Sequence, residues 1–398
     1  MRRIAWVLLL VYAFAIPWEY SLDLGEPLGN IARIVGLLLL LVAIPAVLQA
    51  GRLRKPGPMQ WLALAFYLWF CCTYFWTIDP LATQARMRGY FQEMMVVWLV
   101  WEFAESAGDL HALLRATVAG SWVLALLTIA NFVTAEAVAN QIRFVAEGQD
   151  PNDVARYLNL GFPLAALLVN SERRWMWRLL AAGYLPLGLV AVLLTASRGG
   201  IVAAVVALGG SAVLLAYGHP KRTLAGALAL PPMVALLWWI VPGGSFERLA
   251  TISEQLQGGD LNQRLNIWSA GWHAFVRAPF FGTGAGSFVS AAGMAPVDTA
   301  HNTALSIAVS GGLVALTLAM AIVAAAIWAL MQTCGPMKWA MAVALAAWVV
   351  TSLVATVEES RSTWLLLAMI AVAWRLGAEQ PEEMTACLPT YSNSDFLA

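Results

Sequence analysis

The chain alternates between long apolar runs and short polar connections. A helix needs about 20 apolar residues to cross the hydrocarbon core of a bilayer, and most of the runs approach that length. The fourth, sixth and twelfth runs are the shortest. The pattern predicts about twelve membrane-spanning helices, at residues 4–18, 31–50, 60–77, 90–104, 112–134, 157–171, 177–196, 199–217, 223–241, 303–331, 337–357 and 363–378.

The polar stretch 242–302 is a long interruption late in this pattern. Asp260 and Gln263 resemble a capping box, and Pro279 with the glycines after it ends the helix that follows. A shorter helix is expected at residues 245–256. Both should lie on the outer membrane surface or over the bundle, as a lid. The longer helix is predicted because apolar residues recur at helical spacing, at Leu261, Leu265, Trp268, Trp272 and Val276.

Composition supports a membrane protein. Hydrophobic residues make up 61% of the 398 positions and charged residues 12%, whereas soluble domains carry about 25% charged residues. We therefore expect an all-α polytopic membrane protein. The first run ends at Pro17-Trp18-Glu19 without a small-residue cleavage site, which predicts an uncleaved first span. The four cysteines show neither a disulfide framework nor metal-ligand spacing, so we expect no metal. We also expect no cofactor.

The basic residues predict the orientation. Lys55, Lys221 and Lys338 fall in turns that alternate with loops poorer in Lys and Arg, and the positive-inside rule places such turns in the cytoplasm. Both termini are then cytoplasmic. We expect residues 1–378 to form one membrane domain and the acidic tail 379–398 to be disordered.

The positive charge on the predicted outer side comes from arginine alone. The planar guanidinium binds phosphate oxygens with two hydrogen bonds, whereas the lysine ammonium acts as a point charge, so this bias suggests recognition of a phosphate or pyrophosphate. Individual arginines could instead pair with Asp or Glu or extend to lipid headgroups. The set comprises Arg33, Arg86, Arg88, Arg143, Arg156, Arg198, Arg248, Arg264, Arg277 and Arg361.

A polar motif after Arg143 predicts the start of a helix. The sequence Asp150-Pro151-Asn152-Asp153 precedes an apolar run, and Asn152 or Asp153 is the expected N-cap. A helix start needs no function, but its N-terminus on the outer side could bind an anion.

Two further residues are candidates for chemistry. Arg198 lies in a tight turn between two spans, where an ionisable side chain is costly and indicates function unless it extends to the interface. His301 opens the tenth span after a glycine-rich turn. An imidazole there could take a proton from a hydroxyl, although a lone histidine is as often structural.

These motifs resemble the signature of the O-antigen ligase and O-antigen polymerase superfamily. The resemblance covers about residues 143–320 and depends on the order of several short motifs. They are the loop Asp150-Pro151-Asn152, then Ser197-Arg198-Gly199, Arg264 with Trp268, Pro279 through Gly282-Thr283-Gly284 and Phe288, His301-Asn302, and Gly311-Gly312.

The resemblance implies a metal-independent, inverting glycosyltransferase that works on the periplasmic face of the bacterial inner membrane. Its donor would be a glycan on undecaprenyl pyrophosphate. The acceptor would be the lipid A core of lipopolysaccharide in a ligase, or another lipid-linked repeat unit in a polymerase. Arg198 and Arg264 would stabilise the pyrophosphate and His301 would activate the acceptor hydroxyl. The other residues expected at the substrates are Arg143, Asn152, Trp268 and Asn302.

One departure from the family pattern concerns the acceptor. The connection between Gly286 and His301 is short, which leaves less room for an acceptor site made by this loop alone. The shared motifs do not separate ligase from polymerase. A transporter of an anion would also place arginines at a cavity, but it should carry more acids within its spans than Glu93 and Glu102. A scaffold without activity explains neither the arginine bias nor the order of the motifs.

Overall fold

The computed structural model describes residues 1–25, 29–135, 143–217, 228, 231–232, 235–251, 263–295 and 299–379. About 80% of the structure is helical, and the described residues contain no strand, which confirms the predicted all-α fold for this part of the chain. The long helices are α1 (Arg2–Ala15), α2 (Ile31–Ala50), α3 (Pro58–Cys72), α4 (Pro80–Phe103), α5 (Ala107–Thr134), α6 (Pro151–Ser171), α7 (Trp175–Leu194), α8 (Arg198–Ala216), α14 (Thr303–Gln332), α15 (Gly335–Ser352) and α16 (Arg361–Glu379).

Shorter helices connect these elements or lie beside them. They are the 3₁₀ helices η1 (Ile16–Ser21) and η2 (Thr73–Phe75), and α10 (Gly243–Ala250), α12 (Arg264–Arg277) and α13 (Phe288–Ala292).

Within the described part of the chain, six helical stretches are long and apolar enough to cross a membrane. The exact number of twelve spans stays a prediction, since the ninth expected span, 223–241, lies partly outside the described residues. The six stretches are Arg2–Ser21, Ile31–Ala50, Ala107–Thr134, Trp175–Leu194, Arg198–Ala216 and Thr303–Gln332.

Two helices predicted from short apolar runs form the centre of the bundle. Every residue of α6 from Val154 to Leu168 is buried, and most of α16 is buried as well. Helix α6 packs against α5, α7, α8 and α15, while α16 packs against α4, α14 and α15. Because these helices contact protein rather than lipid, they can carry polar residues, and these residues shorten the apolar runs in the sequence.

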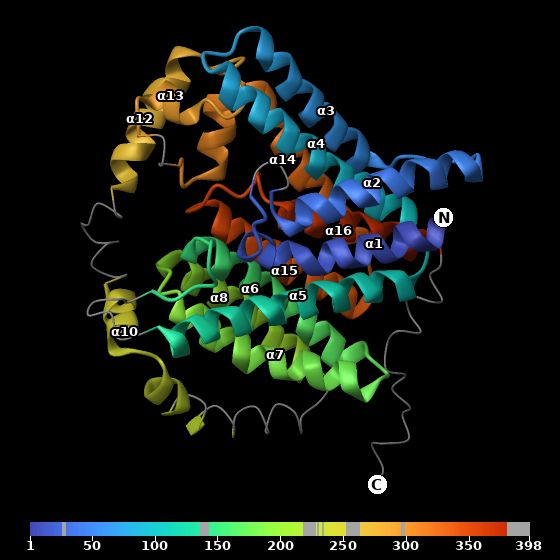
Figure 1. The fold of residues 1–398 in the computed structure, drawn as a ribbon, viewed down its shortest axis with the longest axis vertical. Coiled ribbons are helices and arrows are strands. Elements are labelled where there is room, and N and C mark those ends of the chain that lie inside the picture. The colour runs from blue at the N-terminus through green and yellow to red at the C-terminus, as the bar shows by residue number, and fades with distance from the viewer. Residues whose placement is uncertain are drawn as a thin grey trace.

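The two ends of the bundle differ. Figure 1 shows α10, α12 and α13 gathered at one end, which we call the α12 end, and the N-terminus at the other. At the N-terminal end Arg2 pairs with Glu102 at 2.9 Å, and Arg54 lies 3.8 Å from Glu379, the last residue of α16. Helix α1 therefore begins near the point where α16 ends, while the side of the membrane on which the two ends lie stays a prediction. Glu379 belongs to the helix rather than to the expected tail, and residues 380–398 lie outside the described part.

Helix α14 is broken at Gly312, where φ is +68°. The segment 278–284 enters this break, because the amides of Thr283 and Gly284 donate to the carbonyls of Val309 and Ser310, each at 2.9 Å. The glycine-rich motif is thus a backbone insertion into a helix, and the break divides α14 into Thr303–Gly311 and a longer second part.

Candidate active site

The turn Thr195–Ser197 positions Arg198 at the start of α8. Ser197 is the N-cap of the helix and accepts a hydrogen bond from the amide of Gly200. A Cβ atom on Gly200 would lie 2.4 Å from the Cβ of Ala155, so the absence of a side chain at this position lets α8 pack closely on α6. Ala196 adopts a φ of +46°, a conformation that costs an L-residue about 1–2 kcal/mol.

Two arginines from other segments hold this turn. The Nε of Arg143 donates to the carbonyl of Thr195 at 3.1 Å, and the Nε of Arg248, on α10, donates to the carbonyl of Ala196 at 3.3 Å. Arg198 itself donates to Thr251 at 3.1 Å. The turn between α7 and α8 is therefore joined to the loop 242–302 and to the segment before α6.

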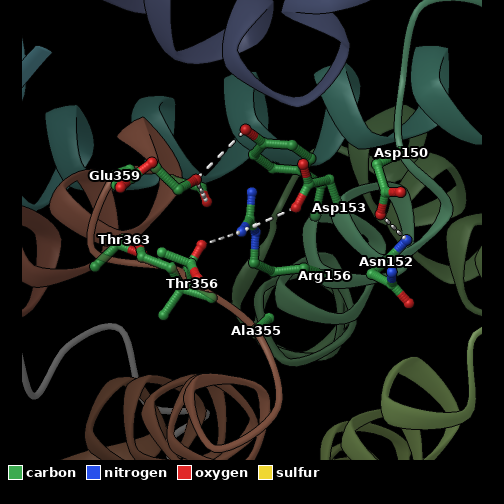
Figure 2. Close-up of polar contacts among 12 residues, drawn as sticks. Asp150, Asn152, Asp153, Arg156, Ala355, Thr356, Glu359 and Thr363 are labelled. Carbon is green, nitrogen blue, oxygen red and sulfur yellow. Dashed lines mark hydrogen bonds and ion pairs between the residues drawn. The ribbon is translucent and has the colours of Figure 1, made fainter. Parts of the chain in front are cut away.

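Asn152 joins the same turn but is not a helix cap. The N-cap of α6 is Asp150, whose side chain accepts from the amide of Asn152 (Figure 2), so the expectation of Asn152 or Asp153 as the cap is wrong. Pro151 occupies the first helical position, which its fixed φ suits, so the helix starts earlier in the chain than expected and Asp150 is its cap. The carboxamide oxygen of Asn152 then accepts from Ser197 at 2.8 Å and from Arg143 at 3.4 Å.

The arginines in this region repel one another. Burial lowers the pKa of Arg143, and the charges of Arg248, Arg198 and Arg264 lower it further, while Asp150 opposes them. Burial and the charge of Arg198 likewise lower the pKa of Arg264. We call Arg143, Arg198, Arg248 and Arg264 the arginine cluster. A group of cations that disfavour one another is stabilised by a multiply charged anion.

The sequence placed Arg248 among the outer arginines without assigning it to the site. The structure brings Arg248 to the site because α10 lies against the turn that precedes Arg198, where Arg248 donates to the carbonyl of Ala196. The helix expected at residues 245–256 is observed as α10, Gly243–Ala250, and residues 252–262 lie outside the described part of the chain.

Helix α12 carries Arg264 at its first position. The helix begins after Gln263, and Asp260, the expected cap, lies outside the described residues. Of the predicted apolar face, Leu265, Trp272 and Val276 are about half exposed. This exposure fits a helix that lies on a surface of lipid headgroups, and Figure 1 shows α12 beside the ends of the long helices.

Two predicted residues hold the segment of His301. Trp268, one turn after Arg264, donates its indole N–H to the carbonyl of Ala300 at 3.1 Å. Asn302 is the N-cap of α14 and also donates to the carbonyl of Leu353 at 3.2 Å. His301 adopts a φ of +47°, and its Nδ1 lies 3.3 Å from the hydroxyl of Thr299. Trp268 therefore ties the segment of the histidine to the helix of Arg264.

Three other outer arginines have structural partners. Arg156 pairs with Asp153 at 3.1 Å and donates to the carbonyl of Thr356 at 3.5 Å (Figure 2). Arg86 pairs with Glu359, and Arg361 with the buried Glu19. Charge pairing explains these three arginines, which makes them weaker candidates for the anion site than the members of the cluster.

Metal ligands are a separate question. Across the described ranges, no three His, Cys, Asp or Glu side chains lie close enough together to hold a metal ion.

The comparison with known families matches this part of the chain. A family model described as O-Antigen ligase matches residues 182–320. The match covers part of the chain and supports the O-antigen ligase-like superfamily. No curated protein sequence gives a significant match. The matched region contains Arg198, Arg248, Arg264 and His301, whereas Arg143 lies before it. Members of this family are glycosyltransferase-like enzymes that act on lipid-linked glycans, and the apolar helices of the chain indicate a multi-pass membrane protein.

Proposed function

We propose that the protein transfers an O-antigen glycan from undecaprenyl pyrophosphate to the lipid A core of lipopolysaccharide. The reaction would take place on the periplasmic face of the bacterial inner membrane, with both termini in the cytoplasm. The observation that supports this proposal most strongly is the arginine cluster, which brings mutually repelling cations to the turn of Arg198. A pyrophosphate neutralises such a group without a metal ion.

In the proposed reaction, the oxygen of an acceptor hydroxyl attacks the anomeric carbon of the donor glycan. His301 accepts the proton of that hydroxyl. The bond between the anomeric carbon and the pyrophosphate oxygen breaks, and undecaprenyl pyrophosphate leaves with the electron pair. Attack from the face opposite the leaving group inverts the configuration. Arg198 and Arg264 stabilise the charge that develops on the leaving oxygen.

The remaining predicted residues take supporting parts in this proposal. Arg143 contributes charge and holds the turn of Arg198, while Asn152 fixes Ser197 beside it. Trp268 and Asn302 position the segment of His301. The loop 242–302 acts as a lid that completes the site, within a single membrane domain that ends with α16, and the tail after Glu379 remains in the cytoplasm.

A transfer assay in proteoliposomes tests the assignment. We expect Arg198→Ala, Arg264→Ala and His301→Ala each to lower kcat by about 100-fold or more, the usual cost of a lost group that stabilises the transition state. Arg88→Ala is the control, because Arg88 is exposed on α4 and outside the cluster. Full activity in all three site variants would overturn the assignment.

The main alternative is a polymerase of the same superfamily that joins lipid-linked repeat units. Deletion of the gene separates the two functions. Loss of all glycan from the lipid A core is expected for a ligase, whereas single repeat units that remain attached to the core would indicate a polymerase.

A further inference from the structure

An apolar crevice opens at the end of α12 opposite Arg264. It has a volume of about 670 Å³, well within the range of small-molecule sites. Residues from the end of α3 and the segment after it form one wall, and the residues that follow α12 form the other. Its lining consists of Trp69, Cys72, Trp76, Ala278, Pro279, Phe280, Phe281 and Gly282.

The aromatic walls of the crevice present ring faces rather than polar groups. The indole N–H of Trp69 donates to the carbonyl of Gly311 at 2.8 Å, and that of Trp76 donates to the carbonyl of Phe281 at 3.3 Å. The ring of Phe281 lies 6.0 Å from each of these indoles. Since the polar atoms of both tryptophans bond to the protein, the surface left for a ligand is apolar.

The backbone around the crevice is fixed by the break in α14. The amide of Leu313 donates to the carbonyl of Pro279 at 2.8 Å, and a Cβ atom on Gly312 would lie 2.2 Å from the carbonyl oxygen of Phe280. Such close packing holds the walls in place before a ligand arrives, which lowers the entropy cost of binding.

Exposed apolar side chains occur in and next to the crevice lining. Phe280, which lines the crevice, and Phe75, which precedes the lining residue Trp76, are 63% and 86% exposed. In a protein that spans a bilayer, a band of exposed aromatic and aliphatic residues marks the lipid interface. The crevice can therefore be entered from the lipid.

Its position separates it from the expected site of the donor pyrophosphate. Helix α12 runs for 14 residues between Arg264 and the crevice, which is about 21 Å at 1.5 Å per residue. The segment Thr303–Gly311 connects the crevice with His301 over about 13 Å. The prenyl chain of the donor begins at the pyrophosphate and would therefore lie near Arg264. The crevice, which is far from Arg264 but closer to His301, fits a second lipid whose sugar reaches His301 better than it fits the donor.

We propose that the crevice holds acyl chains of the acceptor glycolipid while its sugar hydroxyl lies at His301. The proposal rests on the proposed function, which requires a lipid-anchored acceptor. It also explains how the site accommodates an acceptor although the chain between Gly286 and His301 is short. The crevice supplies the anchor, and α12 and the first segment of α14 bridge the distance to the base.

Cys72 gives the crevice a built-in reporter, since it is exposed and lines the cavity. The full chain with Cys71, Cys334 and Cys387 replaced by Ser is purified in detergent and treated with N-ethylmaleimide. We expect rough lipopolysaccharide, which carries the lipid A core, to slow the labelling of Cys72 about fourfold when its concentration is about three times its Kd, because only the unbound fraction reacts. Phosphatidylglycerol at the same acyl concentration should not.

The other outcomes overturn the proposal. Equal protection by phosphatidylglycerol would show an ordinary lipid-facing surface, and protection by undecaprenyl pyrophosphate alone would show a prenyl site. The labelling is repeated with His301→Ala, which should bind lipopolysaccharide as well as the parent does. Because this measurement needs no transfer, loss of protection and loss of the proposed activity are separate results.

Kinetics test whether binding in the crevice serves the reaction. Ala278→Phe fills the crevice and should raise KM for the acceptor at least about fourfold, with kcat and the KM for the donor unchanged. Trp272→Ala is the matched control, because Trp272 is an exposed aromatic residue of α12 outside the crevice. An unchanged acceptor KM in a variant that retains its melting temperature would contradict the proposal.

Discussion

At the scale of single residues, the members of the arginine cluster differ in how they are held. Arg143 and Arg248 each donate a hydrogen bond from Nε to a backbone carbonyl of one turn. Arg198 lies at the start of α8, directly after this turn. Arg264 lies at the start of another helix. Two arginines therefore fix the turn that precedes Arg198, next to which the proposed anion would bind.

The shape of the guanidinium should matter at Arg264. Arg264→Lys keeps the charge but loses the planar pair of donors. We expect kcat to fall at least about tenfold, because one lost hydrogen bond to a charged group costs about 1.5 kcal/mol. The variant is compared with Arg264→Ala and the wild type in the proteoliposome assay.

The matched control is Arg277→Lys, at the other end of α12, where the side chain donates to the carbonyl of Ala291. Its transfer rate should remain close to that of the wild type. If Arg264→Lys also leaves the transfer rate unchanged, Arg264 acts only through its charge, and the proposed contact through two hydrogen bonds is wrong.

The sequence identified the outer arginines but could not divide them into paired and clustered ones. Arg361 pairs with Glu19 and Arg86 with Glu359, partners that lie far away along the chain and carry no local signal. Arg156, by contrast, pairs with Asp153 at the spacing of one helical turn, and this contact could have been predicted.

At the scale of elements, the break in α14 organises both the candidate site and the crevice. The sequence indicated Gly311-Gly312 as part of a motif, whereas the apolar pattern predicted one continuous span through them. Hydropathy does not reveal this break, because the residues on both sides of it are apolar. The helix carbonyls that lose their partners at the break accept hydrogen bonds from the amides of residues 283 and 284. The same limit explains the short apolar runs of α6 and α16, which are buried by protein rather than by lipid.

Gly312→Ala should disrupt this element. The new Cβ would meet the carbonyl oxygen of Phe280 at 2.2 Å, and φ is +68° at this residue. Backbone strain and overpacking together should cost about 3 kcal/mol or more, seen as a lower melting temperature of the purified protein. The control is Gly209→Ala in α8, where a Cβ meets open space and helix propensity should improve stability slightly. Equal melting temperatures for both variants would show that the break tolerates a side chain.

At the scale of the whole molecule, a buried ionic network joins the beginning of the chain to its last helix. Glu19, which follows α1, is 1% exposed and pairs with Arg361 at the start of α16. Tyr157 on α6 donates to the same carboxylate at 3.3 Å, and Arg361 also donates to Gln92 on α4 at 2.6 Å. Helices from three regions of the sequence thus meet at one carboxylate, next to the loop that holds Asn302.

Removing one partner of this pair should cost more than removing both. Arg361→Met leaves the Glu19 carboxylate buried without its cation, and we expect a loss of about 3–5 kcal/mol in stability. The double variant Glu19→Gln/Arg361→Met carries no buried charge at this place, and its carboxamide oxygen can still accept from Tyr157. It should therefore recover most of the lost stability. The melting temperatures of the wild type, both single variants and the double variant in detergent, with Glu19→Gln as the second single variant, form a double-mutant cycle. Since the pair lies outside the arginine cluster, the double variant should also retain transfer activity. If the effects of the two single substitutions simply add, Glu19 and Arg361 are not coupled, and the two ends of the chain are held together by apolar packing instead.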